Sequence, residues 1–148
     1  MKFMFGNMLE AIEPGPVYLV TTNSYIRKDG ALVMGRGAAR QLAGMFPKLP
    51  YALGERIEHL GEYNVGVLTD TATGLSLGAF QVKFNFADEA DLDLIKRSVA
   101  ELTQVATERS DRTFHLNYPG IGNGKLSIDD VEHLLEPLPD NVMVWRFR

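Results

Sequence analysis

The fold is decided by residues 17–39, whose sequence is VYLVTTNSYIRKDGALVMGRGAA. Residues 17–21 form a continuous apolar run, which is typical of a strand covered on both faces of a sheet. A loop is expected over residues 23–37, and a helix is expected to begin at Gly37. Glycines allow the backbone to approach an anion closely, and a helix start offers unpaired N–H groups. Gly35-Arg36-Gly37 is therefore either an anion-binding turn or an ordinary tight turn.

A second segment repeats this arrangement at residues 119–127, PGIGNGKLS. The short apolar strand before it contains Phe114 and Leu116, and the loop carries three glycines in five residues, with Lys125 after them. A connecting loop without a ligand is one interpretation. Because both loops are expected at the same edge of the sheet, a diphosphate held between them is the other.

The remaining pattern predicts an α/β fold. Further strands are expected at residues 2–5, 65–68, 75–86, 113–117 and 141–147. Further helices are expected from Pro50 to a stop at Gly61, at 88–108 and after Ser127. Asp88 is the expected N-cap of the long helix, and Ser127 with Asp130 forms a capping box. Helices between several strands indicate a three-layer α/β/α architecture with a mixed sheet of about six strands. Ligands in such folds lie beyond the carboxyl ends of strands.

Composition limits the possible functions. The chain has 148 residues, which favours a single domain over residues 1–148. It contains no cysteine, so disulfides and thiolate metal sites are excluded, and its three histidines have no metal-ligand spacing. The net charge of -4 argues against a dedicated duplex-DNA binder. No apolar stretch approaches the ~20 residues of a membrane span, and a cytoplasmic protein without a membrane partner is expected.

Lys83 and Trp145 are the other candidates for a functional role. Strand alternation over residues 80–86 would place the phenylalanines on one face and Lys83 on the other. That polar face is either solvated or opens into a cleft, where Lys83 could act as an amine nucleophile. Trp145 is the only tryptophan, and it is either a core residue or a cover for a base or ring.

Together these motifs resemble a macrodomain, the module that binds ADP-ribose, over nearly the whole chain. Residues 6–9, Gly-Asn-Met-Leu, are similar to the opening motif whose acidic residue contacts adenine. Residues 19–23 are similar to the strand that ends in the asparagine facing the distal ribose. Residues 34–39 are similar to the glycine-rich loop of that family, and residues 119–124 to its phosphate loop.

Within this family, the chain resembles most the terminal ADP-ribose glycohydrolases and the DNA ADP-ribosyl glycohydrolase antitoxins. Members carry a catalytic lysine at a strand end, which residues 80–83 match, so the resemblance gives this role to Lys83. Three positions depart from the pattern. Asn7 replaces the acidic adenine contact, and Ala38-Ala39 offers no carboxylate. The loop after Gly124 is shorter than in the human-type glycohydrolase, so the catalytic aspartate of that enzyme has no counterpart. The last two departures leave a reaction that depends on the lysine alone.

The resemblance implies binding of ADP-ribose or a derivative and hydrolysis of an ADP-ribosyl bond by Lys83, without metal or cofactor. A non-catalytic ADP-ribose reader and a phosphatase for ADP-ribose 1″-phosphate are the alternatives. Nucleic acid is expected only as a modified substrate, and the chain is expected to be a monomer. The implied ligand-binding residues are Asn7, Met8, Asn23, Gly35, Arg36, Gly37, Gly120, Ile121, Gly122, Asn123, Gly124, Lys125 and Trp145.

Overall fold

The computed structural model describes residues 1–60, 65–70 and 72–147. Its strands are β1 (Lys2–Phe5), β2 (Val17–Thr22), β3 (Val65–Thr69), β4 (Ser76–Gln81), β5 (Phe114–Asn117) and β6 (Val142–Arg146). They form one six-stranded sheet in the order β1-β6-β5-β2-β4-β3. All neighbouring strands are parallel except β3 and β4, which are antiparallel. The prediction of a mixed sheet of about six strands is confirmed.

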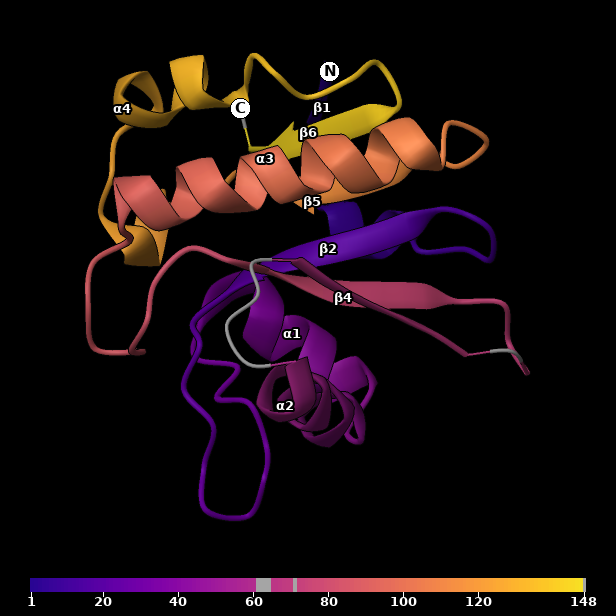
Figure 1. The fold of residues 1–148 in the computed structure, drawn as a ribbon, viewed down its shortest axis with the longest axis vertical. Coiled ribbons are helices and arrows are strands. Elements are labelled where there is room, and N and C mark those ends of the chain that lie inside the picture. Colours follow the sequence, from indigo (N-terminus) through magenta and orange to yellow (C-terminus); the bar gives the residue numbers. More distant parts are fainter. Residues whose placement is uncertain (61–64, 71, 148) are drawn as a thin grey trace.

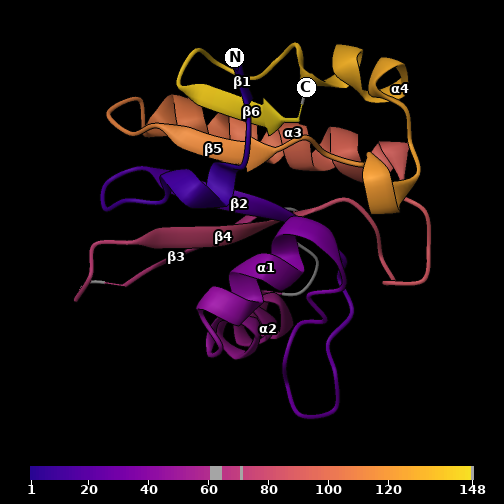
Figure 2. The same ribbon diagram turned by 180° about the vertical axis from the view of Figure 1, so that it is seen from behind.

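Helices cover both faces of this sheet (Figures 1 and 2). The α-helices are α1 (Gly37–Met45), α2 (Leu49–Leu60), α3 (Leu92–Glu108) and α4 (Ile128–Glu132), and the 3-10 helices are η1 (Met8–Ala11), η2 (Gly122–Gly124) and η3 (His133–Leu135). The apolar run of β2 serves both layers, because alternate side chains of a strand point to opposite faces. Val17 and Leu19 pack with residues of α3, and Tyr18 and Val20 pack with residues of α1 and α2. This two-sided burial explains why the run shows no polar alternation.

The strand expected over residues 75–86 ends earlier, at Gln81. All six residues of β4 are buried, but Phe84 and Phe86 are 47% and 50% exposed. The chain turns there because the side chain of Asn85 accepts a hydrogen bond from Ala87 N–H. The prediction that Phe84 and Phe86 lie on the same strand face as Phe80 is therefore wrong, and Lys83 lies in a loop and not in the strand.

The long helix also begins later than expected. Its N-cap is Asp91, whose carboxylate accepts hydrogen bonds from the N–H groups of Asp93 and Leu94. Asp88 cannot cap the helix, because it belongs to the preceding turn and donates its N–H to Asn85 O. The capping box of Ser127 and Asp130 is present at the start of α4. The stop expected at Gly61 lies outside the described residues.

None of the described helices combines the length and the apolar character needed to cross a membrane.

Candidate functional site

A cavity of about 850 Å³ opens at the carboxyl ends of β2, β4, β5 and β6. The chain passes from β2 to β4 through α1 on one face, and from β4 to β5 through α3 on the other. Connections that leave in opposite directions create a crevice beyond the strand ends, where ligands bind in open α/β sheets.

Nearly all of the residues predicted for the site line this one cavity. They are Asn7, Met8, Asn23, Gly35, Arg36, Gly37, Lys83, Gly120, Ile121, Gly122, Gly124, Lys125 and Trp145. Asn123 lies in η2, and its side chain is outside the described part of the structure. The sequence motifs therefore meet at one place, although Asn7 and Trp145 are 138 positions apart in the chain.

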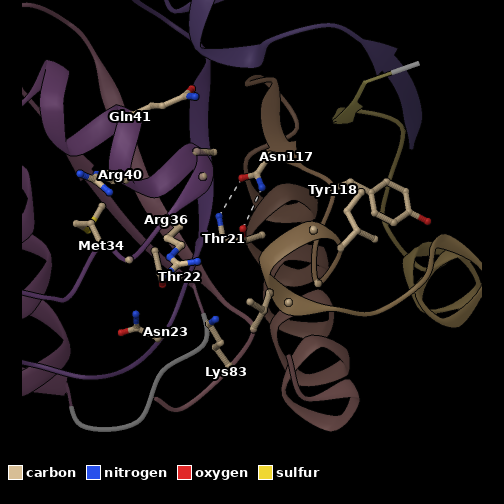
Figure 3. A pocket seen from close by; sticks show the side chains of 18 of the residues that line it. Thr21, Thr22, Asn23, Met34, Arg36, Arg40, Gln41, Lys83, Asn117 and Tyr118 are labelled. Carbon is tan, nitrogen blue, oxygen red and sulfur yellow. Dashed lines mark hydrogen bonds between the residues drawn. The ribbon is translucent and has the colours of Figure 1, made fainter. Parts of the chain in front are cut away.

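Asn117 opens the sheet at the floor of the cavity. The β2–β5 pairing ends at Leu19 and Leu116, and beyond it Thr21 N–H donates to Asn117 Oδ1 at 2.9 Å. Asn117 Nδ2 donates in turn to Thr21 Oγ1 at 2.9 Å (Figure 3). The side chain of Asn117 thus replaces the backbone hydrogen bonds between β2 and β5 at this point, and the two strands separate. Neither residue was predicted as part of the site, although a polar residue that ends a buried strand is a detectable signal.

Replacing Asn117 by alanine is expected to lower the free energy of unfolding by about 2 kcal/mol, because Thr21 N–H loses its acceptor in a partly buried position. Asn117→Asp keeps that acceptor and should lose less. Urea denaturation of the three proteins measures the difference. Equal stability of Asn117→Ala and the wild type would show that water replaces the amide without cost.

The first glycine-rich loop is anchored by Asn23. Its side chain is 3% exposed, donates from Nδ2 to Val33 O at 2.8 Å and accepts at Oδ1 from Tyr25 N–H at 2.9 Å. One amide proton of Nδ2 remains for a ligand. Gly35 and Gly37 have φ values of +56° and +68°, which side chains rarely adopt. Arg36, the N-cap of α1, makes no side-chain cap, so the first N–H groups of α1 are open to an anion.

The second loop contains glycines of two kinds. A Cβ on Gly120 would lie 2.9 Å from Ile95 Cδ1, and one on Gly124 would lie 3.0 Å from Ala90 Cβ. These two glycines allow the loop to pack against the start of α3. Gly122, with φ +67°, has no protein atom within 4 Å of such a Cβ. Gly122 therefore leaves open space beside the cavity, which a bound anion can use.

The cavity is rich in positive charge. Five cationic residues of the described part of the chain line it, although the full chain carries a net charge of -4. They are Arg36, Arg40, Lys83, Lys125 and Arg146. Asp88 is the one carboxylate among the described lining residues. This excess of positive charge suits a ligand with at least two negative charges.

Lys83 lies in the segment that follows β4, and this segment lies beside the segment that follows β2. Val82 N–H donates to Thr22 O at 2.9 Å, and the Ser24 hydroxyl donates to Lys83 O at 3.2 Å. The amine of Lys83 donates to the carbonyls of Phe86 and Asp88, at 3.3 and 3.2 Å. Figure 3 shows this amine pointing toward the end of β2, near Thr22 and Asn23.

Trp145 and Asn7 lie in another part of the cavity wall. Asn7 caps η1 by accepting a hydrogen bond from Leu9 N–H at 3.1 Å, which leaves its amide NH₂ free for a ligand. A Cβ on Gly6 would lie 3.9 Å from the Trp145 ring, so backbone and indole are in contact there. This part of the cavity offers an aromatic side chain and an amide, which suit a heteroaromatic ring.

Several lining residues were not predicted. They are Thr21, Thr22, Arg40, Gln41, Asn117, Tyr118 and Arg146. The Thr22 hydroxyl is buried and has no hydrogen-bond partner among the residues that the structure describes. Its position directly before Asn23 is the only signal in the sequence. In the described part of the chain, no group of three or more histidines and carboxylates is placed to hold a metal ion.

No protein-family model and no curated protein matches the chain. Solved structures match it over almost its full length, and they are macrodomains, so the chain has the macrodomain fold and the resemblance stated from the sequence is confirmed. It is similar to the macrodomain of Thermus aquaticus DarG, with 25% identity and a TM-score of 0.78, covering 99% of this chain and 97% of that one.

Two further structures belong to the same group. The macrodomain of Mycobacterium tuberculosis DarG is 23% identical, with a TM-score of 0.72, covering 99% of this chain and 98% of that one. Thermosipho africanus DarTG in complex with ADP-ribose is 15% identical, with a TM-score of 0.78. The match covers 98% of this chain and 41% of the DarTG chain, so this chain corresponds to less than half of that protein.

Proposed function

We propose that this chain binds ADP-ribose in the cavity and hydrolyses an ADP-ribosyl bond, with Lys83 as the nucleophile. One observation carries the proposal: two glycine-rich loops and five cationic side chains surround a single cavity at the carboxyl ends of the strands. The ADP-ribose held by Thermosipho africanus DarTG, which shares the fold, supports the choice of ligand.

In this proposal the diphosphate lies between the two loops. The open N–H groups at the start of α1 and the space beside Gly122 receive its oxygens. Arg36 and Lys125, which both line the cavity, supply charge. Adenine lies toward Asn7 and Trp145, and the distal ribose lies toward Asn23 and Lys83.

The contacts of Lys83 are compatible with nucleophilic attack. A neutral amine has two N–H bonds and one lone pair, and the carbonyls of Phe86 and Asp88 provide one acceptor for each N–H. The lone pair is then free to attack the anomeric carbon of the distal ribose. A C–N bond forms while the bond to the attached group breaks, and that group leaves with the electron pair and gains a proton. The ribose ring then opens to give an imine between Lys83 and the anomeric carbon. Water hydrolyses this imine, which releases ADP-ribose and restores Lys83.

The binding step is tested by calorimetry. ADP-ribose is expected to bind with a micromolar Kd, about -8 kcal/mol, and AMP much more weakly. Gly122→Ala should weaken ADP-ribose binding by more than about tenfold, because the added methyl group fills space that the diphosphate needs.

Gly30→Ala is the matched control. Gly30 also has a positive φ, +89°, and no protein atom within 4 Å of an added Cβ, but it does not line the cavity. The control variant therefore carries similar backbone strain and should keep the wild-type affinity. No heat with millimolar ADP-ribose would contradict the proposed function, and equal affinities of both variants would place the ligand elsewhere.

A further inference from the structure

The indole of Trp145 is held in the cavity wall by a hydrogen bond to His115. Trp145 Nε1 donates to His115 Nδ1 at 2.8 Å, and the two rings are 5.9 Å apart between centroids. Trp145 comes from β6 and His115 from the neighbouring β5. The orientation of the only tryptophan of the chain therefore depends on a titratable group that does not itself line the cavity.

His115 is itself fixed by its surroundings. Its ring stacks on Tyr18, with 4.9 Å between centroids and 15° between planes. Tyr18 is 1% exposed, and its hydroxyl donates to Ala11 O at 2.9 Å and accepts from Glu13 N–H at 3.2 Å. Because His115 is held against this buried ring, the position of its Nδ1 determines where the indole N–H can point.

The hydrogen bond requires neutral His115. An indole N–H only donates, so Nδ1 must accept and cannot carry a proton. Protonation of the imidazole would place a second N–H at Nδ1, facing the indole N–H at the present 2.8 Å. Two donors cannot share that contact, and the indole must then turn or shift.

We infer that His115 is a positioning residue for Trp145, and that protonation of His115 releases the indole and weakens ligand binding. The effect on binding rests on the proposed function, whereas the coupling between the two rings does not. The ligand part that depends on Trp145 is the adenine ring, an uncharged aromatic group.

The charged groups around His115 set the direction of the pH dependence. The elements packed against β5 near the ring are β2, β6 and η1. Tyr18 on β2, Arg146 on β6 and Glu10 on η1 are their titratable or charged residues. Glu13, just after η1, is the one described residue that acts on the ring through its charge, and it favours protonation. Burial is the larger cause, and it lowers the pKa of His115 below its ordinary value.

Since the pKa of His115 is lowered, the imidazole is neutral at pH 7, and ligand affinity should not change with pH in that range. Affinity should decrease only as the pH falls through the pKa of His115, below about 6.5.

Fluorescence of Trp145 tests the coupling directly, because the chain has no other tryptophan. Titration from about pH 8 to about pH 4.5 should change the emission of the wild type in one step, with a midpoint below about 6.5. His115→Gln keeps an acceptor that does not titrate, so this step should disappear. His115→Phe keeps a stacking ring without an acceptor, so its emission should resemble the acid form of the wild type at every pH.

His133→Gln is the matched control, since His133 lies in η3, whereas the indole N–H of Trp145 donates to His115. It should keep the full transition. Circular dichroism at each pH confirms that the fold persists. A transition that survives in His115→Gln, or that is missing from the wild type, would overturn the inference.

Binding of ADP-ribose to the same proteins tests the consequence. The wild type should lose about fivefold in affinity across the fluorescence transition, the size expected for one lost hydrogen bond. His115→Phe should show the same loss at neutral pH, and His115→Gln should restore binding. A fluorescence transition without any ADP-ribose binding would reject the proposed function and leave the coupling standing. Binding that does not change across the transition would overturn the inferred role in ligand binding.

Discussion

Lys83→Ala is expected to lose at least about 100-fold in turnover of an ADP-ribosylated substrate, while its ADP-ribose affinity stays within about tenfold, or ~1.4 kcal/mol, of the wild type. The amine is the group that forms the new bond, so nothing replaces it in the variant. The glycine loops and the cationic residues that hold the diphosphate remain. Lys83→Arg should also be inactive, because a guanidinium stays charged and has no lone pair for attack.

The assay uses three substrates: an ADP-ribosylated protein, an ADP-ribosylated nucleic acid and ADP-ribose 1″-phosphate. Borohydride added during turnover should trap a covalent adduct on the wild type only. Lys96→Ala, an exposed position on α3, removes the same charge outside the cavity and should behave as the wild type. Normal turnover by Lys83→Ala, without any adduct, would assign the reaction to a bound water. Binding without turnover on all three substrates would make the protein an ADP-ribose reader.

Gly54→Ala is expected to be the most destabilising of the glycine substitutions, at about 3 kcal/mol or more, because its neighbours cannot move aside. An added Cβ on this residue of α2 would overlap the carbonyl oxygen of Gly30 and lie 2.9 Å from Leu32 N. Leu32 N–H donates to Pro50 O at 2.9 Å, which holds the two segments together. Both atoms met by the new Cβ belong to backbone, not to a flexible side chain.

Gly44→Ala is the matched control in α1. A Cβ there would meet no atom within 4 Å, so the change removes only the entropic cost of a helical glycine. It should raise the free energy of unfolding by about 0.5–1 kcal/mol. Urea denaturation compares both variants with the wild type. If Gly54→Ala is as stable as Gly44→Ala, then residues 30–32 do not pack on α2 as the structure describes.

The sequence by itself determined the elements whose signals are local. The apolar run of β2, the start of α1 at Gly37 and the capping box at Ser127 depend on residues a few positions apart, and all three were predicted correctly. The two glycine-rich loops were also placed beyond strand ends, because the order of elements fixes where parallel strands end. The cavity therefore contains the motifs that the sequence singled out.

Other features depended on the tertiary structure, because they join residues that are distant along the chain. Asn117 bonds Thr21 across 96 positions and Trp145 bonds His115 across 30, and no local pattern encodes either pair. Phe84 and Phe86 do not continue the face of Phe80, because β4 already ends at Gln81 and the chain turns at Asn85, after Lys83. Gly44 and Gly54 look equivalent as helical glycines in the sequence. The backbone of Gly30 and Leu32, which packs against α2, leaves no room for a side chain at Gly54, since the space beside a Cα depends on the segment that folds against it.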